Sequence, residues 1–90
     1  MKYIMLRTNG KLKRDIPIIF PDLLAHKDVA DAIAGMELYS DLNGADVVSA
    51  GFCNVGVKCF GESESCNAVS REVDGVVINT YDYTHGLMFD

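Results

Sequence analysis

The segment CFGESESCNAVSREVD, residues 59–74, brings serines, cysteines, carboxylates and an arginine close together in the sequence. Ser63 and Ser65 supply hydroxyl donors, and the guanidinium of Arg71 can bind a phosphate or carboxylate through two parallel hydrogen bonds. Ser70 and Arg71 stand at an expected helix start, where free N–H groups and the helix dipole favour an anion. The segment therefore predicts an anion site built from Ser63, Ser65, Ser70 and Arg71.

Aromatic residues follow this segment at Tyr81 and Tyr83. A tyrosine ring can stack on a nucleotide base, so these two residues extend the predicted site from a phosphate to a small anionic nucleotide. Glu62, Glu64 and Glu72 oppose this interpretation, because their carboxylates repel an anion. The alternative is that the segment is a solvated connection followed by a capped helix.

Catalytic groups are sparse. Glu62 and Glu64 would share one face of a strand, where the charge of one raises the pKa of the other. Together with His85 they give a small hydrolase as one alternative. His26 and His85 are far apart in the sequence, so no Ser-His-Asp arrangement can be assembled, and His26 is expected at the surface of a helix start. We predict no catalytic residue and a protein that is not an enzyme.

The cysteines Cys53, Cys59 and Cys66 have the spacing C-x5-C-x6-C. Zinc sites need four ligands and usually contain close pairs such as C-x2-C, so neither a metal nor a cofactor is expected. Cys53 and Cys59 flank a predicted turn and are expected to face the core as small hydrophobic residues. Cys66 is the one candidate nucleophile, with no evident base. The odd number of cysteines and the absence of a signal-peptide pattern favour free thiols in a cytoplasm.

The charge is unevenly distributed. The chain of 90 residues has a net charge of −5, yet five of its eight basic residues fall within the first fourteen. The acidic remainder argues against nucleic-acid binding and is compatible with docking onto a basic protein surface, or simply with solubility. The N-terminal apolar run is too short to span a membrane. A chain of this length predicts one domain, residues 1–90, and a homo-oligomer is the expected aid to its stability.

Hydrophobic periodicity predicts an α+β fold of order β-β-α-β-β-α. The expected elements are strands at 2–8, 11–20, 45–53 and 57–60, a helix near 25–36, a loop at 61–69 and a helix at 70–83. Asn9-Gly10 and residues 54–56 are the expected hairpin turns, and Pro17 indicates an edge or a bulge. The simplest packing is a two-layer domain, an antiparallel sheet of about four strands with both helices on one face.

The two helices differ in the clarity of their apolar faces. The first is expected to bury Ala25, Val29, Ala32, Ile33 and Met36, to expose Asp28 and Asp31, and to end at Gly35. The second is expected to be capped by Ser70 and to bury Val73, Val76, Val77 and Tyr81. Its residues 75–80 are also good strand formers, so a strand there is the alternative. Leu87, Met88 and Phe89 are expected to fold back or to contact a second subunit.

The chain resembles a family of small proteins encoded by bacteriophages and prophages. The resemblance rests on His26, Asp28, Val29 and Ala30, on Ser49–Phe52, on Gly61, Ser63 and Ser65, and on Ser70-Arg71. It covers about half of the chain and implies an accessory protein in the cytoplasm of the host bacterium. We therefore expect a non-enzymatic anti-defence protein that sequesters a small nucleotide signal in an oligomer, or one that blocks a host protein through its acidic body, including Asp28 and Asp31, and its exposed tail.

Overall fold

The computed structural model describes residues 1–8, 13–35, 45–54 and 58–81. Its elements, in chain order, are β1 (Lys2–Arg7), β2 (Asp15–Phe20), α1 (His26–Ala34), β3 (Asp46–Asn54), β4 (Lys58–Phe60), β5 (Glu62–Ser63), β6 (Ala68–Val69) and α2 (Glu72–Thr80). The predicted α+β class, the four-stranded antiparallel sheet and the two helices are confirmed. The predicted turn at Asn9-Gly10, most of the turn at 54–56, and the tail with Tyr83, His85 and Leu87–Phe89 lie outside the described residues.

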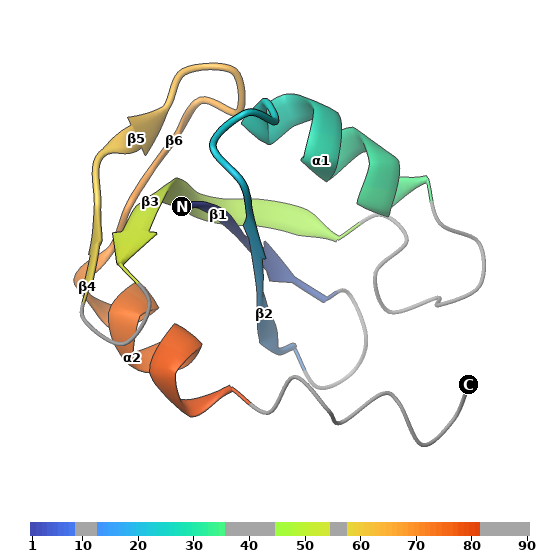
Figure 1. Ribbon diagram of the computed structural model, residues 1–90. Helices are drawn as coiled ribbons and strands as arrows, with labels where there is room; N and C mark the ends of the chain where they lie inside the picture. Colours follow the sequence, from blue (N-terminus) through green and yellow to red (C-terminus); the bar gives the residue numbers. More distant parts are fainter. Residues whose placement is uncertain (9–12, 36–44, 55–57, 82–90) are drawn as a thin grey trace.

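Strand β1 lies at the centre of the sheet, whose order is β2-β1-β3-β4 (Figure 1). It pairs antiparallel with β2, from Lys2 opposite Phe20 to Arg7 opposite Asp15, and with β3 on its other side. Pro17 therefore lies in an edge strand, as predicted, where its missing N–H does least harm to the ladder. Four consecutive β1 residues are buried, namely Tyr3, Ile4, Met5 and Leu6, which requires cover on both faces of the sheet.

The two helices supply that cover from opposite sides, rather than from the one face expected (Figure 1). On one side Tyr3 and Met5 pack with Cys53 and with Ile78 of α2. On the other side Ile4 and Leu6 pack with Phe20 and Ala50 beneath Val29 and Ile33 of α1. Ala25 and Ala32, which were also expected to be buried, are exposed, so the buried face of α1 is narrower than predicted. The unbroken apolar run of β1 carries the signal for this arrangement, since a sheet covered on one face alternates apolar and polar residues instead.

The expected loop at 61–69 contains a short hairpin, β5–β6, which lies on the same side of the sheet as α1. Because Gly51 of β3 has no side chain, the backbone of Phe60 and Gly61 can pass close to it. A Cβ at Gly51 would stand only 2.5 Å from the carbonyl oxygen of Phe60. Gly61, where the chain turns from β4 into the hairpin, has a φ of 77°, a conformation that glycine adopts without strain.

Helix α2 differs from its prediction in two respects. It begins at Glu72 with Arg71 as its N-cap, so Ser70 is not the capping residue. The side chain of Asp74 accepts the backbone N–H of Arg71 at 2.9 Å and so performs the capping from inside the first turn. Val73 and Val76, predicted to be in the core, are exposed, and Asp74, Gly75 and Ile78 are buried in their place.

Candidate functional site at the start of helix α2

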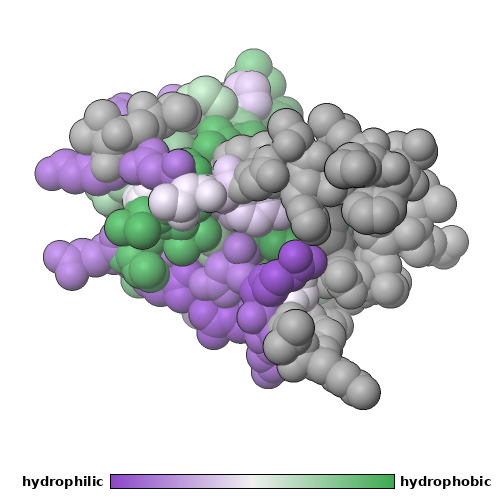
Figure 2. Space-filling model, turned by 90° about the horizontal axis from the view of Figure 1, so that it is seen from below, coloured by the Kyte–Doolittle hydropathy of each residue, from purple (hydrophilic) through white to green (hydrophobic). Residues whose placement is uncertain are grey.

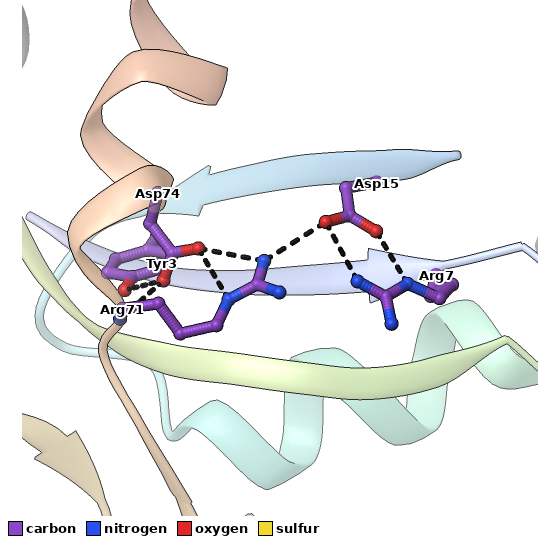
Figure 3. Close-up of polar contacts among 5 residues, drawn as sticks. All are labelled: Tyr3, Arg7, Asp15, Arg71 and Asp74. Carbon is purple, nitrogen blue, oxygen red and sulfur yellow. Dashed lines mark hydrogen bonds and ion pairs between the residues drawn. The ribbon is translucent and has the colours of Figure 1, made fainter. Parts of the chain in front are cut away.

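A chain of polar contacts joins the start of α2 to the two strands beneath it (Figure 3). At its inner end the hydroxyl of Tyr3 donates to Oδ2 of Asp74 at 2.5 Å, and neither side chain is exposed to solvent. Burial, and then the neighbouring Asp74 carboxylate, raise the pKa of Tyr3 well above its ordinary value. The phenol is therefore a fixed hydrogen-bond donor that holds a buried carboxylate in place.

Arg71 forms the middle of this series of polar contacts. Its Nε donates to Oδ1 of Asp74 at 3.0 Å, and its Nη2 lies 3.0 Å from Oδ2 of Asp15. Burial acts to lower the pKa of Arg71, but its bonds to Asp15 and Asp74 outweigh that effect and raise the pKa. The guanidinium is 29% exposed, and it neutralises the one fully buried charge of α2.

Arg7 and Asp15 form the outer end of the series of polar contacts. Nε and Nη2 of Arg7 donate to the two carboxylate oxygens of Asp15, at 2.8 and 3.2 Å. These hydrogen bonds from Arg7, helped by Arg71, hold the pKa of Asp15 below its ordinary value despite partial burial. Arg7 and Asp15 face each other in the β1–β2 register, so the pair closes the end of that hairpin.

The network therefore contains two positive and two negative groups, with every charge opposed by its neighbour. It ties α2 to β1 and β2 in one orientation. The predicted anion site would have to compete with Asp15 and Asp74 for the donors of Arg71. That site stays a prediction, and the contacts that the structure describes give Arg71 a structural role.

Ser63 and Ser65 lie together, but near the start of α1 rather than the start of α2. Ser63 is buried, its Oγ accepts the N–H of Cys66 at 3.2 Å, and it lies 3.3 Å from Oγ of Ser65. Oγ of Ser65 in turn accepts the backbone N–H of Lys27, in the first turn of α1, at 3.3 Å. The two hydroxyls thus form a bridge that ties the β5–β6 hairpin to α1.

The remaining predicted residues lie along the connection into and out of α2. Ser70 donates its N–H to the carbonyl oxygen of Gly61 at 2.9 Å, which closes the base of the β5–β6 hairpin. Tyr81 follows the last turn of α2. Glu62 and Glu64 are exposed, and no pairing between them is seen. Tyr83 and His85 lie outside the described residues, so the hydrolase arrangement with His85 has no described geometry.

His26 is buried, and the prediction that it lies at the surface is wrong. Its Nε2 lies 2.9 Å from the carbonyl oxygen of Gly51, and because a carbonyl only accepts, Nε2 carries the proton. The ring also makes edge contacts with Phe20 and Phe52. Its position at a helix start suggested exposure, yet α1 begins directly over the sheet, which places the first residue of the helix inside.

The cysteines are free thiols in the structure. Cys53 is buried among the residues under α2, and Cys59 packs against the same cluster, as expected from the sequence. Cys66 is half-buried in the turn between β5 and β6. Within the described ranges, no group of three or more His, Cys, Asp or Glu side chains could hold a metal ion.

The outer face of α2 carries apolar side chains that the sequence predicted to be buried. Val73 and Val76 are 48% and 62% exposed, and they are neighbours on the helix surface because they stand three positions apart. Glu72 is exposed beside them, and Val69 is exposed shortly before the helix. Figure 2 views the molecule from the side of α2 and shows hydrophobic atoms at the surface beside hydrophilic ones. We call Glu72, Val73 and Val76 the outer α2 face.

Comparison of the chain with family models, with curated proteins and with solved structures found no match. The resemblance to small phage proteins therefore remains a prediction. Among the described residues, no helix is long and apolar enough to cross a membrane.

Proposed function

We propose that this chain is a non-enzymatic binding protein that covers part of the surface of another protein, and that the outer α2 face is its contact surface. The observation that supports this most directly is the exposure of Val73 and Val76 on a helix whose start is fixed by buried polar contacts. Adjacent apolar side chains rimmed by charge on a rigid element are typical of a docking surface, because binding removes them from water without ordering the backbone.

The charge around this face indicates the chemistry of the partner. The residues of α2, EVDGVVINT, include two acids and no basic residue. The nearest arginine, Arg71, is already paired with Asp15 and Asp74. An apolar contact patch surrounded by lysine or arginine on the partner would be complementary to this surface.

A second copy of the chain fits the same face less well. In a two-fold dimer the same patch faces itself, so the second copy of α2 would bring the same two acids and no basic residue to the contact. The predicted homo-oligomer would have to use another surface. We therefore assign the outer α2 face to a different protein that is basic at its contact patch.

The resemblance to phage accessory proteins extends the proposal to a partner of the bacterial host, which the chain would block by stoichiometric binding. The nucleotide alternative has less support, since the donors of Arg71 are directed at Asp15 and Asp74 and the hydroxyls of Ser63 and Ser65 serve the start of α1.

Site-specific crosslinking tests the proposal. A photo-crosslinking residue replaces Val76 on the outer α2 face or, as the matched control, Ala32 on the exposed side of α1. In bacterial cells that express the chain, position 76 should crosslink one basic protein and position 32 should not. Equal crosslinking at both positions, none at position 76, or crosslinking of position 76 to a second copy of the chain would each overturn the assignment of this face.

A further inference from the structure

Cys53 and Cys59 face each other directly across β3 and β4. The N–H of Cys53 donates to the carbonyl oxygen of Met1 at 2.8 Å, and the carbonyl oxygen of Cys53 accepts from the amino group of Met1 at 3.3 Å. The N–H and C=O of one strand residue point to the same side, so neither of these groups points toward β4. Cys53 and Cys59 are therefore a non-hydrogen-bonded pair of the antiparallel ladder.

This type of pair suits a disulfide. Its Cα atoms approach to about 4.5 Å, closer than those of a hydrogen-bonded pair. Disulfides span Cα separations of about 4.4–6.8 Å, so a bond between the two sulfurs requires no rearrangement of the strands. Both side chains point to the side of α2, where they pack with Tyr3 and Ile78.

The two thiols differ in access. Cys53 is 2% exposed, whereas Cys59 is half-buried and belongs to β4, an edge strand of the sheet. Burial raises the pKa of Cys53, and burial together with the nearby Cys53 raises the pKa of Cys59 to about 11. Both groups are therefore thiols at neutral pH, and the pair reacts slowly and resists accidental oxidation.

We propose that Cys53 and Cys59 form a reversible redox site whose oxidant is a low-molecular-weight disulfide such as oxidised glutathione. The thiolate of Cys59 attacks one sulfur of the oxidant, forms a mixed disulfide and releases one thiolate. Cys53 then loses its proton and attacks the sulfur of Cys59, which releases the second thiolate. The two cysteines lose two protons and two electrons in total, and the oxidant is reduced to two thiols.

The position of Tyr3 connects this site to α2. Its hydroxyl donates to Asp74 and also contacts the thiol of Cys59. Oxidation removes the S–H group of Cys59 and binds its sulfur to Cys53, which changes the contact that Tyr3 makes there. The site would thereby report the redox state to the helix that carries the outer α2 face.

The test treats the full chain carrying Cys66→Ser with oxidised glutathione and measures its intact mass. The expected product has lost two hydrogens, holds no glutathione and is restored by dithiothreitol. In the same background, Cys53→Ser should retain one glutathione on Cys59, because no second thiol can displace it. A stable glutathione adduct on the Cys66→Ser chain, or no change in its mass, would overturn the proposal.

Peptide mapping of the oxidised wild-type chain provides a second test that needs no substitution. A crosslink between the peptides of Cys53 and Cys59 is expected, with Cys66 either free or bound to glutathione. A crosslink of Cys66 to either of the other two cysteines would contradict the assigned pair.

Discussion

The hydroxyl of Tyr3, in β1, donates a hydrogen bond of 2.5 Å to Asp74, in α2, across 71 positions of sequence. This contact lies in the interior, and Asp74 also accepts the backbone N–H and the guanidinium of Arg71. One carboxylate therefore caps α2, neutralises Arg71 and fixes the helix on the central strand. This carboxylate determines which side of α2 is buried, and it explains why Val73 and Val76 face the solvent.

Asp74→Asn should lower the free energy of unfolding by about 2–3 kcal/mol, because a buried charge-assisted acceptor is replaced by an amide that also presents donors to Tyr3 and Arg71. The matched control is Glu72→Gln, which removes the same charge from an exposed position of the same turn. Its effect should stay within about 0.5 kcal/mol. Urea unfolding followed by circular dichroism measures both, and equal effects would contradict the role assigned to Asp74.

The raised pKa of Tyr3 predicts a loss of stability in alkali. In the unfolded chain the phenol releases its proton near the ordinary pKa of 10.0, whereas in the folded protein it keeps the proton. The unfolded state then binds fewer protons, so the free energy of unfolding falls as pH rises above about 10. Cys53 and Cys59 act in the same direction from their ordinary value of 9.0.

Tyr3→Phe isolates the contribution of the phenol. The variant should be less stable than the wild type at pH 8, by about 1 kcal/mol for the lost hydrogen bond. Its stability should fall less steeply than that of the wild type above about pH 10. The measurement is urea unfolding of both proteins at increasing pH in a reducing buffer, and parallel curves would show that Tyr3 does not carry this dependence.

Gly51→Ala should destabilise the protein by about 1–3 kcal/mol, since the new methyl group would stand 2.5 Å from the carbonyl oxygen of Phe60 and would push β4 and the following chain outward. Gly35→Ala is the control. Its methyl group would lie 3.5 Å from the carbonyl oxygen of Asp31, an ordinary contact, and the φ of −86° suits alanine. Thermal unfolding should show no loss of stability for that variant, and an equal loss in both would contradict the close approach at Gly51.

His26→Phe keeps a ring between Phe20 and Phe52 but removes the N–H that the carbonyl oxygen of Gly51 accepts. The expected cost is about 1–2 kcal/mol in the free energy of unfolding. Lys27→Gln, at the exposed neighbouring position, should change it by less than about 0.5 kcal/mol. A His26→Phe variant as stable as the wild type would show that the hydrogen bond to Gly51 contributes nothing net.

Local signals in the sequence predicted most of the elements. Three features could be predicted because each depends on residues close together in the chain. They are the apolar run of β1, the edge position implied by Pro17 and the Val29–Ile33 face of α1. The prediction that both helices cover one face of the sheet was wrong. The unbroken burial of Tyr3 to Leu6 follows from cover on both faces.

The contacts of α2 could not be predicted in the same way. Val73, Val76 and Val77 are typical core residues, and only the pairing of Asp74 with Tyr3 and Arg71 explains why a carboxylate is buried in preference to two of those valines. Such pairing depends on the relative placement of β1 and α2, which no local pattern contains. For the same reason the sequence suggested Arg71 as a ligand contact, since Asp15 stands 56 positions away.

The central claim is that the outer α2 face binds a basic protein, and an affinity comparison tests it most directly. The protein crosslinked through position 76 is purified, and its Kd is measured for the wild type, for Val76→Asp and for Ala32→Asp as the matched surface control. Val76→Asp should weaken binding at least about tenfold, the equivalent of 1.4 kcal/mol, while Ala32→Asp leaves the Kd unchanged. Equal Kd values for Val76→Asp and the wild type would contradict the claim.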